Sequence, residues 1–193
     1  MVRGKLTFIS GGVRSGKSTY AEKILTDAKR AENRLVYIAS GTGTDDEMKQ
    51  RIAKHQRDRA DFNWQTIEQP VNLAKIIPFI QHGDFILWDC MTTWLANELY
   101  EGWETGAACI QKPNCMEVKA QQLFVSLQQI LSKAIHVVIV SNEVFSDISS
   151  SHRETEIYRE WLGRLHQQVV AMADVAIEIE GGIPIYWKGE KGE

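Results

Sequence analysis

Short apolar runs alternate with longer amphipathic segments along the chain. A short apolar run bounded by polar or turn-forming residues is typical of a buried strand, whereas apolar residues at helical spacing indicate a helix. The runs predict strands at residues 6–9, 35–39, 64–67, 85–88, 137–140, 175–180 and 183–187. The amphipathic segments predict helices from residue 18 to about 31 and over 45–59, 71–80, 92–100, 116–134 and 153–172. Pro78 is expected to end or kink the helix that contains it.

This alternation predicts an α/β protein, with a mostly parallel sheet covered by helices, in a single domain over residues 1–193. The run at 137–140 is apolar throughout, as expected of a central parallel strand. The last two strands flank Gly181-Gly182 and predict a C-terminal β-hairpin. In sheets of this kind ligands bind at the carboxyl ends of the strands, so chemistry is expected there.

Residues 101–115 show no periodicity and contain several turn-forming residues, so we expect a long surface loop. The helix that follows this loop is amphipathic. We expect its inner face to carry Val118, Leu123, Leu127, Ile130 and Leu131.

The stretch between the first strand and the first helix fits the pattern G-x-x-x-x-G-K-[ST] of a phosphate-binding loop. In such a loop the backbone N–H groups point into a concavity at the positive end of the helix dipole. Lys17 is expected to reach the β- and γ-phosphates, and the Ser18 hydroxyl to hold Mg²⁺. The alternative, a glycine-rich turn that binds nothing, does not explain the full match in this context. We therefore expect a nucleoside triphosphate to bind the loop, whose residues are Gly11, Gly12, Val13, Arg14, Ser15, Gly16, Lys17 and Ser18.

Composition narrows the classes of function. A net charge of -3 and a pI of about 6.0 argue against a nucleic-acid-binding protein. The longest apolar runs have the length of strands, so no membrane span is expected, and the first residues lack the features of a signal peptide. The three cysteines show no framework spacing, so we expect reduced thiols and a cytoplasmic protein.

Asp89 closes the apolar strand at 85–88. In phosphate-loop enzymes an acidic residue at such a position holds Mg²⁺, directly or through water. The alternative is that Asp89 caps the next helix. Asn142, in the polar run that follows the central strand, lies where ligands bind, but polar residues after a strand are also ordinary in loops.

His55 lies on the apolar face of the helix at 45–59, with arginines on either side. A lone histidine at such a position is more often structural than catalytic, and spacing alone identifies no partner for it. The arginines would ordinarily form a solvated face, although they also suit the charge of a triphosphate.

Taken together, the motifs resemble one family, the bifunctional adenosylcobinamide kinase / adenosylcobinamide-phosphate guanylyltransferase of cobalamin synthesis. The similarity extends over nearly the whole chain. It is carried by the phosphate loop, Ala21-Glu22, Tyr37-Ile38-Ala39, Asp46-Glu47-Met48, Arg51-Ile52, His55, Trp64, Thr66, Glu68, Asp89-Cys90, Thr92-Thr93-Trp94, Asn97 and Ser141-Asn142-Glu143-Val144. Residues 145–151 depart from the family's glycine-rich loop, and His166 stands where the family commonly has asparagine.

The resemblance implies a RecA-like phosphate-loop fold and a homotrimer, for which the aromatic stretch 94–103 is a candidate contact surface. It implies a kinase step on the hydroxyl of the corrinoid adenosylcobinamide, with ATP or GTP as donor, and then transfer of GMP from GTP, giving adenosylcobinamide-GDP. His55 falls on the residue that the family guanylylates, so His55 and Lys17 are the expected catalytic residues. Beyond the phosphate loop, the implied nucleotide contacts are Gln56, Arg57, Asp58, Arg59, Glu68 and Asp89.

Two other classes of function fit the phosphate loop. One is a small-molecule kinase without a nucleotidyl step, and the other is a regulatory NTPase that acts through a partner. The sequence has no N-K-x-D motif for reading guanine, which weakens the second alternative.

Overall fold

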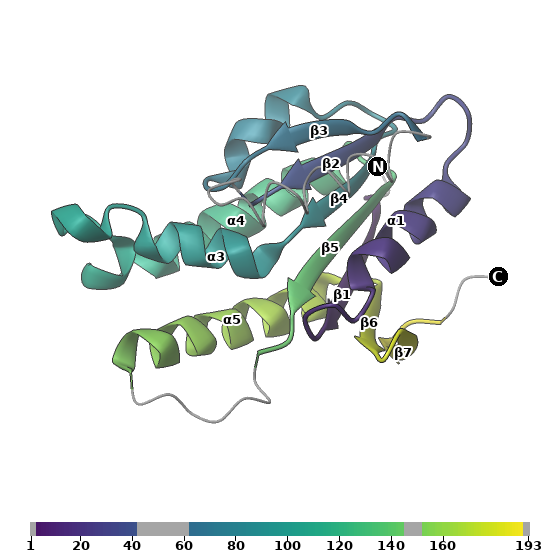
Figure 1. Cartoon of the computed structure of the whole chain (residues 1–193). Helices are drawn as coiled ribbons and strands as arrows, with labels where there is room; N and C mark the ends of the chain where they lie inside the picture. Colours follow the sequence, from purple (N-terminus) through teal and green to yellow (C-terminus); the bar gives the residue numbers. More distant parts are fainter. Residues whose placement is uncertain (1–2, 42–61, 145–151, 191–193) are drawn as a thin grey trace.

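The computed structural model describes residues 3–41, 62–144 and 152–190. Its centre is a seven-stranded sheet in the order β3-β2-β4-β5-β1-β6-β7. Figure 1 shows this order running from β3 at the top to β7 at the lower right. The pairs from β3 to β6 are parallel, and β7 joins β6 antiparallel. The strands are β1 (Lys5–Gly11), β2 (Leu35–Ala39), β3 (Gln65–Glu68), β4 (Phe85–Asp89), β5 (His136–Asn142), β6 (Val175–Glu180) and β7 (Ile183–Lys188).

Four α-helices and three short 3₁₀ segments connect the described strands. They are α1 (Lys17–Ala28), α3 (Met91–Tyr100), α4 (Cys115–Leu131), α5 (Arg153–Met172), η2 (Leu73–Phe79), η3 (Trp103–Thr105) and η4 (Cys109–Gln111). The mostly parallel α/β sheet and the terminal hairpin expected from the sequence are confirmed. The helix expected over 45–59 lies outside the described residues.

In β1, β2, β4 and β5, alternate residues enter two separate cores. The larger core contains Phe8, Ile86 and Trp88 and is covered by η2, α3, α4 and α5. The smaller core contains Ile9 and Leu87 and is covered by α1. This alternation is the two-residue period of an extended strand, so the core that a residue enters shows which side of the sheet it faces.

Two expected helices differ in detail from the structure. The helix expected over 71–80 is a 3₁₀ segment over Leu73–Phe79, and Pro78, which cannot donate a backbone hydrogen bond, lies near its end. On α4, Val118 is 52% exposed and does not belong to the inner face, whereas the other four residues expected there are buried. The buried residues of α4 are Met116, Ala120, Leu123, Ser126, Leu127, Ile130 and Leu131.

The segment 101–115 is not a simple surface loop. Ala108 and Cys109 are buried in it, and Cys109 and Cys115 form a disulfide with their Cα atoms 5.4 Å apart. The expectation of three reduced thiols is therefore wrong, and Cys90 is the free cysteine. Residue spacing alone could not reveal this pair, because it depends on how the chain turns between η4, which begins at Cys109, and α4, which begins at Cys115.

Candidate active site

The phosphate-loop sequence forms the turn between β1 and α1. Gly16 adopts a left-handed conformation (φ 90°) directly before α1, and Arg14 also has a positive φ of 62°. The turn therefore presents the N-terminus of α1, where the first N–H groups of a helix have no intrahelical partner, at the end of the sheet. Such an N-terminus attracts anionic phosphate groups.

Lys17 and Ser15 show how this loop is prepared for a ligand. Lys17 is largely buried, and its ammonium donates to the Gly12 carbonyl of the loop over 2.9 Å. The Ser15 hydroxyl is buried and has no hydrogen-bond partner within the described parts of the chain. A buried hydroxyl without a partner is unusual and fits a loop completed by phosphate oxygens.

Gly11 fixes the loop against the neighbouring strand. A Cβ at this position would lie 2.5 Å from the Ile179 carbonyl oxygen and 2.8 Å from the Ser15 hydroxyl. Only glycine permits this approach, because real Cβ atoms do not come so close to backbone oxygen. The loop is thus packed directly on β6.

Asp89 faces the same side of the sheet as α1. In β4, Phe85 and Leu87 enter the core under α1, while Ile86 and Trp88 enter the opposite core. Asp89 continues the first of these rows. Its carboxylate accepts a hydrogen bond from the Tyr37 hydroxyl over 3.1 Å, and Tyr37 belongs to the core under α1.

Asn142 ends the strand between the phosphate loop and Asp89. Gly11 and Asn142 are register partners, and the Glu143 N–H donates to the Gly11 carbonyl over 2.9 Å. By the alternation of β5, Asn142 also faces α1, since Val138 and Val140 lie in that core. Its side-chain amide donates to the Thr92 hydroxyl over 3.0 Å, which ties β5 to the start of α3.

Glu68 is brought to the same edge from the far side of the sheet. Its register partner is Ala39, and Ala39 in turn pairs with Asp89. Two strand spacings separate Glu68 from Asp89, about 10 Å. Ile67 packs on the opposite core, so Glu68 faces α1. The structure therefore gathers the phosphate loop, Glu68 and Asp89 at one edge and on one face, while Gln56, Arg57, Asp58, Arg59 and His55 lie outside the described residues.

His166 lies on the opposite face. Its Nε2 is 2.7 Å from the Ser141 hydroxyl, and its ring meets Phe8 edge-on at a centroid distance of 5.0 Å. Burial lowers the pKa of His166 to about 4, although nearby Glu143 acts in the opposite direction. His166 is therefore a neutral structural residue behind the site.

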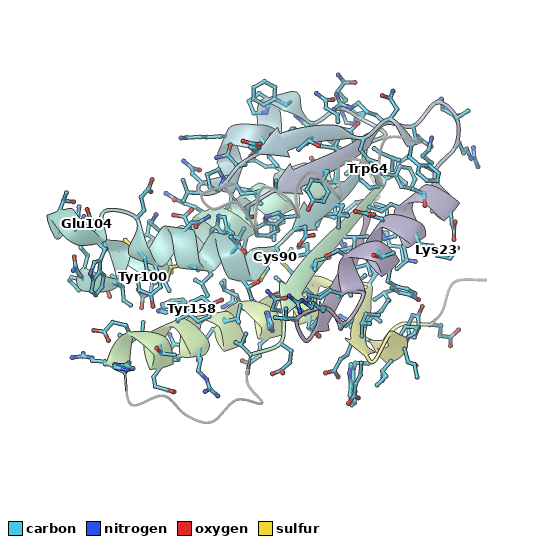
Figure 2. All side chains as sticks on the ribbon, viewed as in Figure 1. Lys23, Trp64, Cys90, Tyr100, Glu104 and Tyr158 are labelled. Atoms are coloured by element: carbon cyan, nitrogen blue, oxygen red, sulfur yellow. A yellow bond between two sulfur atoms is a disulfide. The ribbon has the colours of Figure 1, made fainter. Side chains whose placement is uncertain are left out.

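Cys90 follows Asp89 and lies directly before α3, at the carboxyl edge of the sheet (Figure 2). Its sulfur lies 2.9 Å from the Thr92 hydroxyl and 3.1 Å from the Thr93 hydroxyl. Burial, and next the charge of Asp89, raise the pKa of the thiol, although both threonine contacts lower it. Cys90 is thus a protonated hydrogen-bonding residue, because a thiolate would be disfavoured here.

Sequence reasoning named Tyr37 and Thr92 as part of the family resemblance but assigned them no role in the site, and it left Asn142 undecided. Tyr37 lies two positions before the end of its strand, as Leu87 does before Asp89. The two-residue period would have placed Tyr37 on the site's face, had the order of β2 and β4 been known. The strand period gives no such indication for Thr92, because Thr92 lies in α3 and contacts Asn142 of β5 from there.

Sequence comparison assigns the family. The family described as cobinamide kinase / cobinamide phosphate guanyltransferase (CobU) matches residues 7–186. This chain belongs to the CobU family. Its relatives include the bifunctional adenosylcobalamin biosynthesis protein CobU of Escherichia coli, 30% identical, and of Salmonella typhimurium, 31% identical; each match spans 93% of this chain and 98% of the relative. CobP of Pseudomonas aeruginosa is 30% identical over 94% of this chain and 96% of its own length.

Solved structures agree on the fold. An ATPase of a bacterial type III secretion system superposes with a TM-score of 0.54 at 12% identity, over 95% of this chain and 57% of the ATPase. A protein of Pyrococcus horikoshii superposes with a TM-score of 0.54 at 9% identity, over 99% of this chain and 89% of that protein. These similarities agree with the mostly parallel α/β fold described above for this CobU-family chain. Among the described residues, no helix is both long and apolar enough to cross a membrane.

Proposed function

We propose that this CobU-family enzyme phosphorylates adenosylcobinamide and then transfers GMP from GTP to the resulting phosphate. The observation that carries the proposal is the gathering of the phosphate loop, Asp89 and Glu68 on one face at one edge of the sheet. The family to which the chain belongs supplies the two reactions.

In the kinase step, the loop amides and the N-terminus of α1 hold the triphosphate. Lys17 exchanges its contact with the Gly12 carbonyl for the phosphate oxygens, which are the stronger acceptors because they are charged. The corrinoid hydroxyl attacks the γ-phosphorus and loses its proton to solvent, the bond from that phosphorus to the bridging oxygen breaks, and the nucleoside diphosphate leaves. Positioning and charge neutralisation supply most of the catalysis in such transfers.

Ser18 and Asp89 are the residues that would hold Mg²⁺. A serine hydroxyl and a carboxylate oxygen are the hard ligands that Mg²⁺ prefers, with substrate phosphates and water completing its shell. Bound Mg²⁺ would neutralise phosphate charge during transfer.

In the guanylyl step, we assign the nucleophile to His55 because it falls in the family's Arg-Ile-x-x-His pattern. A neutral imidazole nitrogen of His55 attacks the α-phosphorus of GTP, pyrophosphate leaves, and the imidazole loses its proton to solvent. An oxygen of the corrinoid phosphate then attacks the same phosphorus, the P–N bond breaks, and adenosylcobinamide-GDP is released. The covalent intermediate divides one difficult displacement into two easier ones.

The assembly and location follow the same family reasoning. We propose a homotrimer, and sedimentation of a monomer at micromolar concentration would contradict it. Trp94 is buried and so cannot form part of its contact surface, whereas Trp103 is 45% exposed. We place the enzyme in the cytoplasm, where ATP and GTP are available.

Incubation with GTP labelled at the α-phosphate tests the function. We expect covalent, acid-labile label on the protein and its transfer to adenosylcobinamide phosphate. Label at the γ-phosphate should pass to adenosylcobinamide itself. Transfer of the γ-label without any α-label on the protein would indicate a simple kinase. Binding of GTP without either transfer would indicate a regulatory NTPase.

A further inference from the structure

The Tyr37 hydroxyl is the described polar group that contacts the Asp89 carboxylate from a neighbouring strand. It donates to Oδ2 over 3.1 Å. Tyr37 and Leu87 are register partners, so the phenol extends one step along the sheet to reach Asp89, which follows Leu87 on the same face. Tyr37 and Asp89 both lie on the face of the sheet that α1 covers.

The ring of Tyr37 has little freedom to move. It is almost fully buried in the core under α1, and Trp64 packs edge-on against it with centroids 6.4 Å apart. Because the ring is held by packing, its hydroxyl is a fixed donor. A carboxylate at the end of a strand could otherwise rotate about its terminal bond, since that torsion is broad.

We propose that Tyr37 is a positioning residue for Asp89, and that its hydrogen bond orients the carboxylate toward the divalent cation that accompanies the nucleotide. This inference rests on the proposed role of Asp89. Partners that hold a metal-ligating group in place commonly change metal affinity by about 10–100-fold when they are removed. The same hydrogen bond also has a purely structural explanation, because a buried phenol needs a partner. The experiment must therefore separate positioning from simple satisfaction of the phenol.

Tyr37→Phe removes the donor and keeps the ring that packs in the core. Mn²⁺ binding in the presence of a non-hydrolysable GTP analogue can be followed by electron paramagnetic resonance of the free ion. We expect Tyr37→Phe to weaken Mn²⁺ binding about tenfold and to raise the Mg²⁺ concentration needed for half-maximal kinase activity by a similar factor. Its thermal midpoint should stay within a few degrees of that of the unchanged protein.

Tyr100→Phe is the matched control. The Tyr100 hydroxyl donates to the Glu154 carbonyl over 3.2 Å and lies at the far end of α3 from Asp89. Its removal should leave Mn²⁺ binding unchanged. Equal weakening in the two variants would overturn the proposal, and so would unchanged Mn²⁺ binding by Tyr37→Phe.

A double-mutant cycle tests whether Tyr37 acts through Asp89. Asp89→Asn alone should weaken Mn²⁺ binding and Mg²⁺-dependent activity by about tenfold or more. In that background Tyr37→Phe should have no further effect, whereas an additive effect would overturn the inference. If Asp89→Asn binds Mn²⁺ normally, the proposed role of Asp89 fails and the role of Tyr37 fails with it. If Asp89→Asn weakens Mn²⁺ binding and Tyr37→Phe does not, the proposed role of Tyr37 fails while that of Asp89 stands.

Discussion

The imidazole Nε2 of His166 lies 2.7 Å from the hydroxyl of Ser141, directly behind the strand end that adjoins the phosphate loop. Ser141 is fully buried, so this contact links α5 to the interior of the sheet. The pair is on the opposite face from α1. Its role is therefore to support the end of β5, and its protonation state matters for stability.

Stability is expected to fall in mild acid because two histidines are buried in their neutral form. Burial lowers the pKa of both His136 and His166 from 6.5 to about 4. Between these values the unfolded chain binds more protons than the folded one, so the free energy of unfolding decreases as the pH drops from about 6.5 to about 4. Each histidine should contribute roughly 2 kcal/mol to this loss, and little change from this source is expected above pH 6.5.

Urea unfolding at a series of pH values measures this effect. His166→Asn removes one titrating group and keeps a side chain that can bond Ser141, so its loss of stability between pH 6.5 and 4 should be shallower. An identical acid slope in the variant would show that His166 is not a source of the loss.

Gly11→Ala should destabilise the protein and weaken nucleotide binding. The added methyl group would lie 2.5 Å from the Ile179 carbonyl oxygen, and the backbone of Gly11 has a positive φ. We expect a cost of about 1–3 kcal/mol in chemical unfolding. Gly12→Ala is the matched control for stability, since nothing lies within 4 Å of a Cβ at that position. Equal stability of the two variants would contradict the packing of the loop on β6.

Lys17→Ala is expected to abolish nucleotide turnover while the protein stays folded. Within the described structure, the Lys17 ammonium contacts a loop carbonyl, so its removal breaks one hydrogen bond of the fold and the main cationic contact proposed for the phosphates. Turnover assays and circular dichroism on the same preparation measure both properties. A folded variant with an unchanged rate would reject the loop as the triphosphate site.

His55→Ala is expected to lose the covalent GMP adduct and GMP transfer, yet to retain nucleotide binding at the loop and the kinase step. Mass spectrometry after incubation with GTP detects the adduct. The imidazole of His55 is the proposed nucleophile for the α-phosphorus, whereas the phosphate loop is the proposed site of the triphosphate, so the two functions should separate. Detection of the adduct in His55→Ala would place the nucleophile elsewhere.

Local sequence was sufficient for most of the described elements. The strand Leu35–Ala39 and the helix Arg153–Met172 match the expected bounds, because strand and helix periods are visible within a few residues. The phosphate loop was also predictable, because its motif consists of consecutive residues, from Gly11 to Ser18. Val118 was misassigned because a helix face is decided by what packs against it.

By itself, the sequence determined the family, the phosphate loop and the strand ends that carry polar groups. Only the tertiary structure decided that β5 lies between the loop and Asp89, that Tyr37 donates to Asp89, and that Cys109 pairs with Cys115. The physical reason is that strand order and side-chain contacts depend on segments far apart in the chain. Their pairing follows from packing and loop closure, which no local period records.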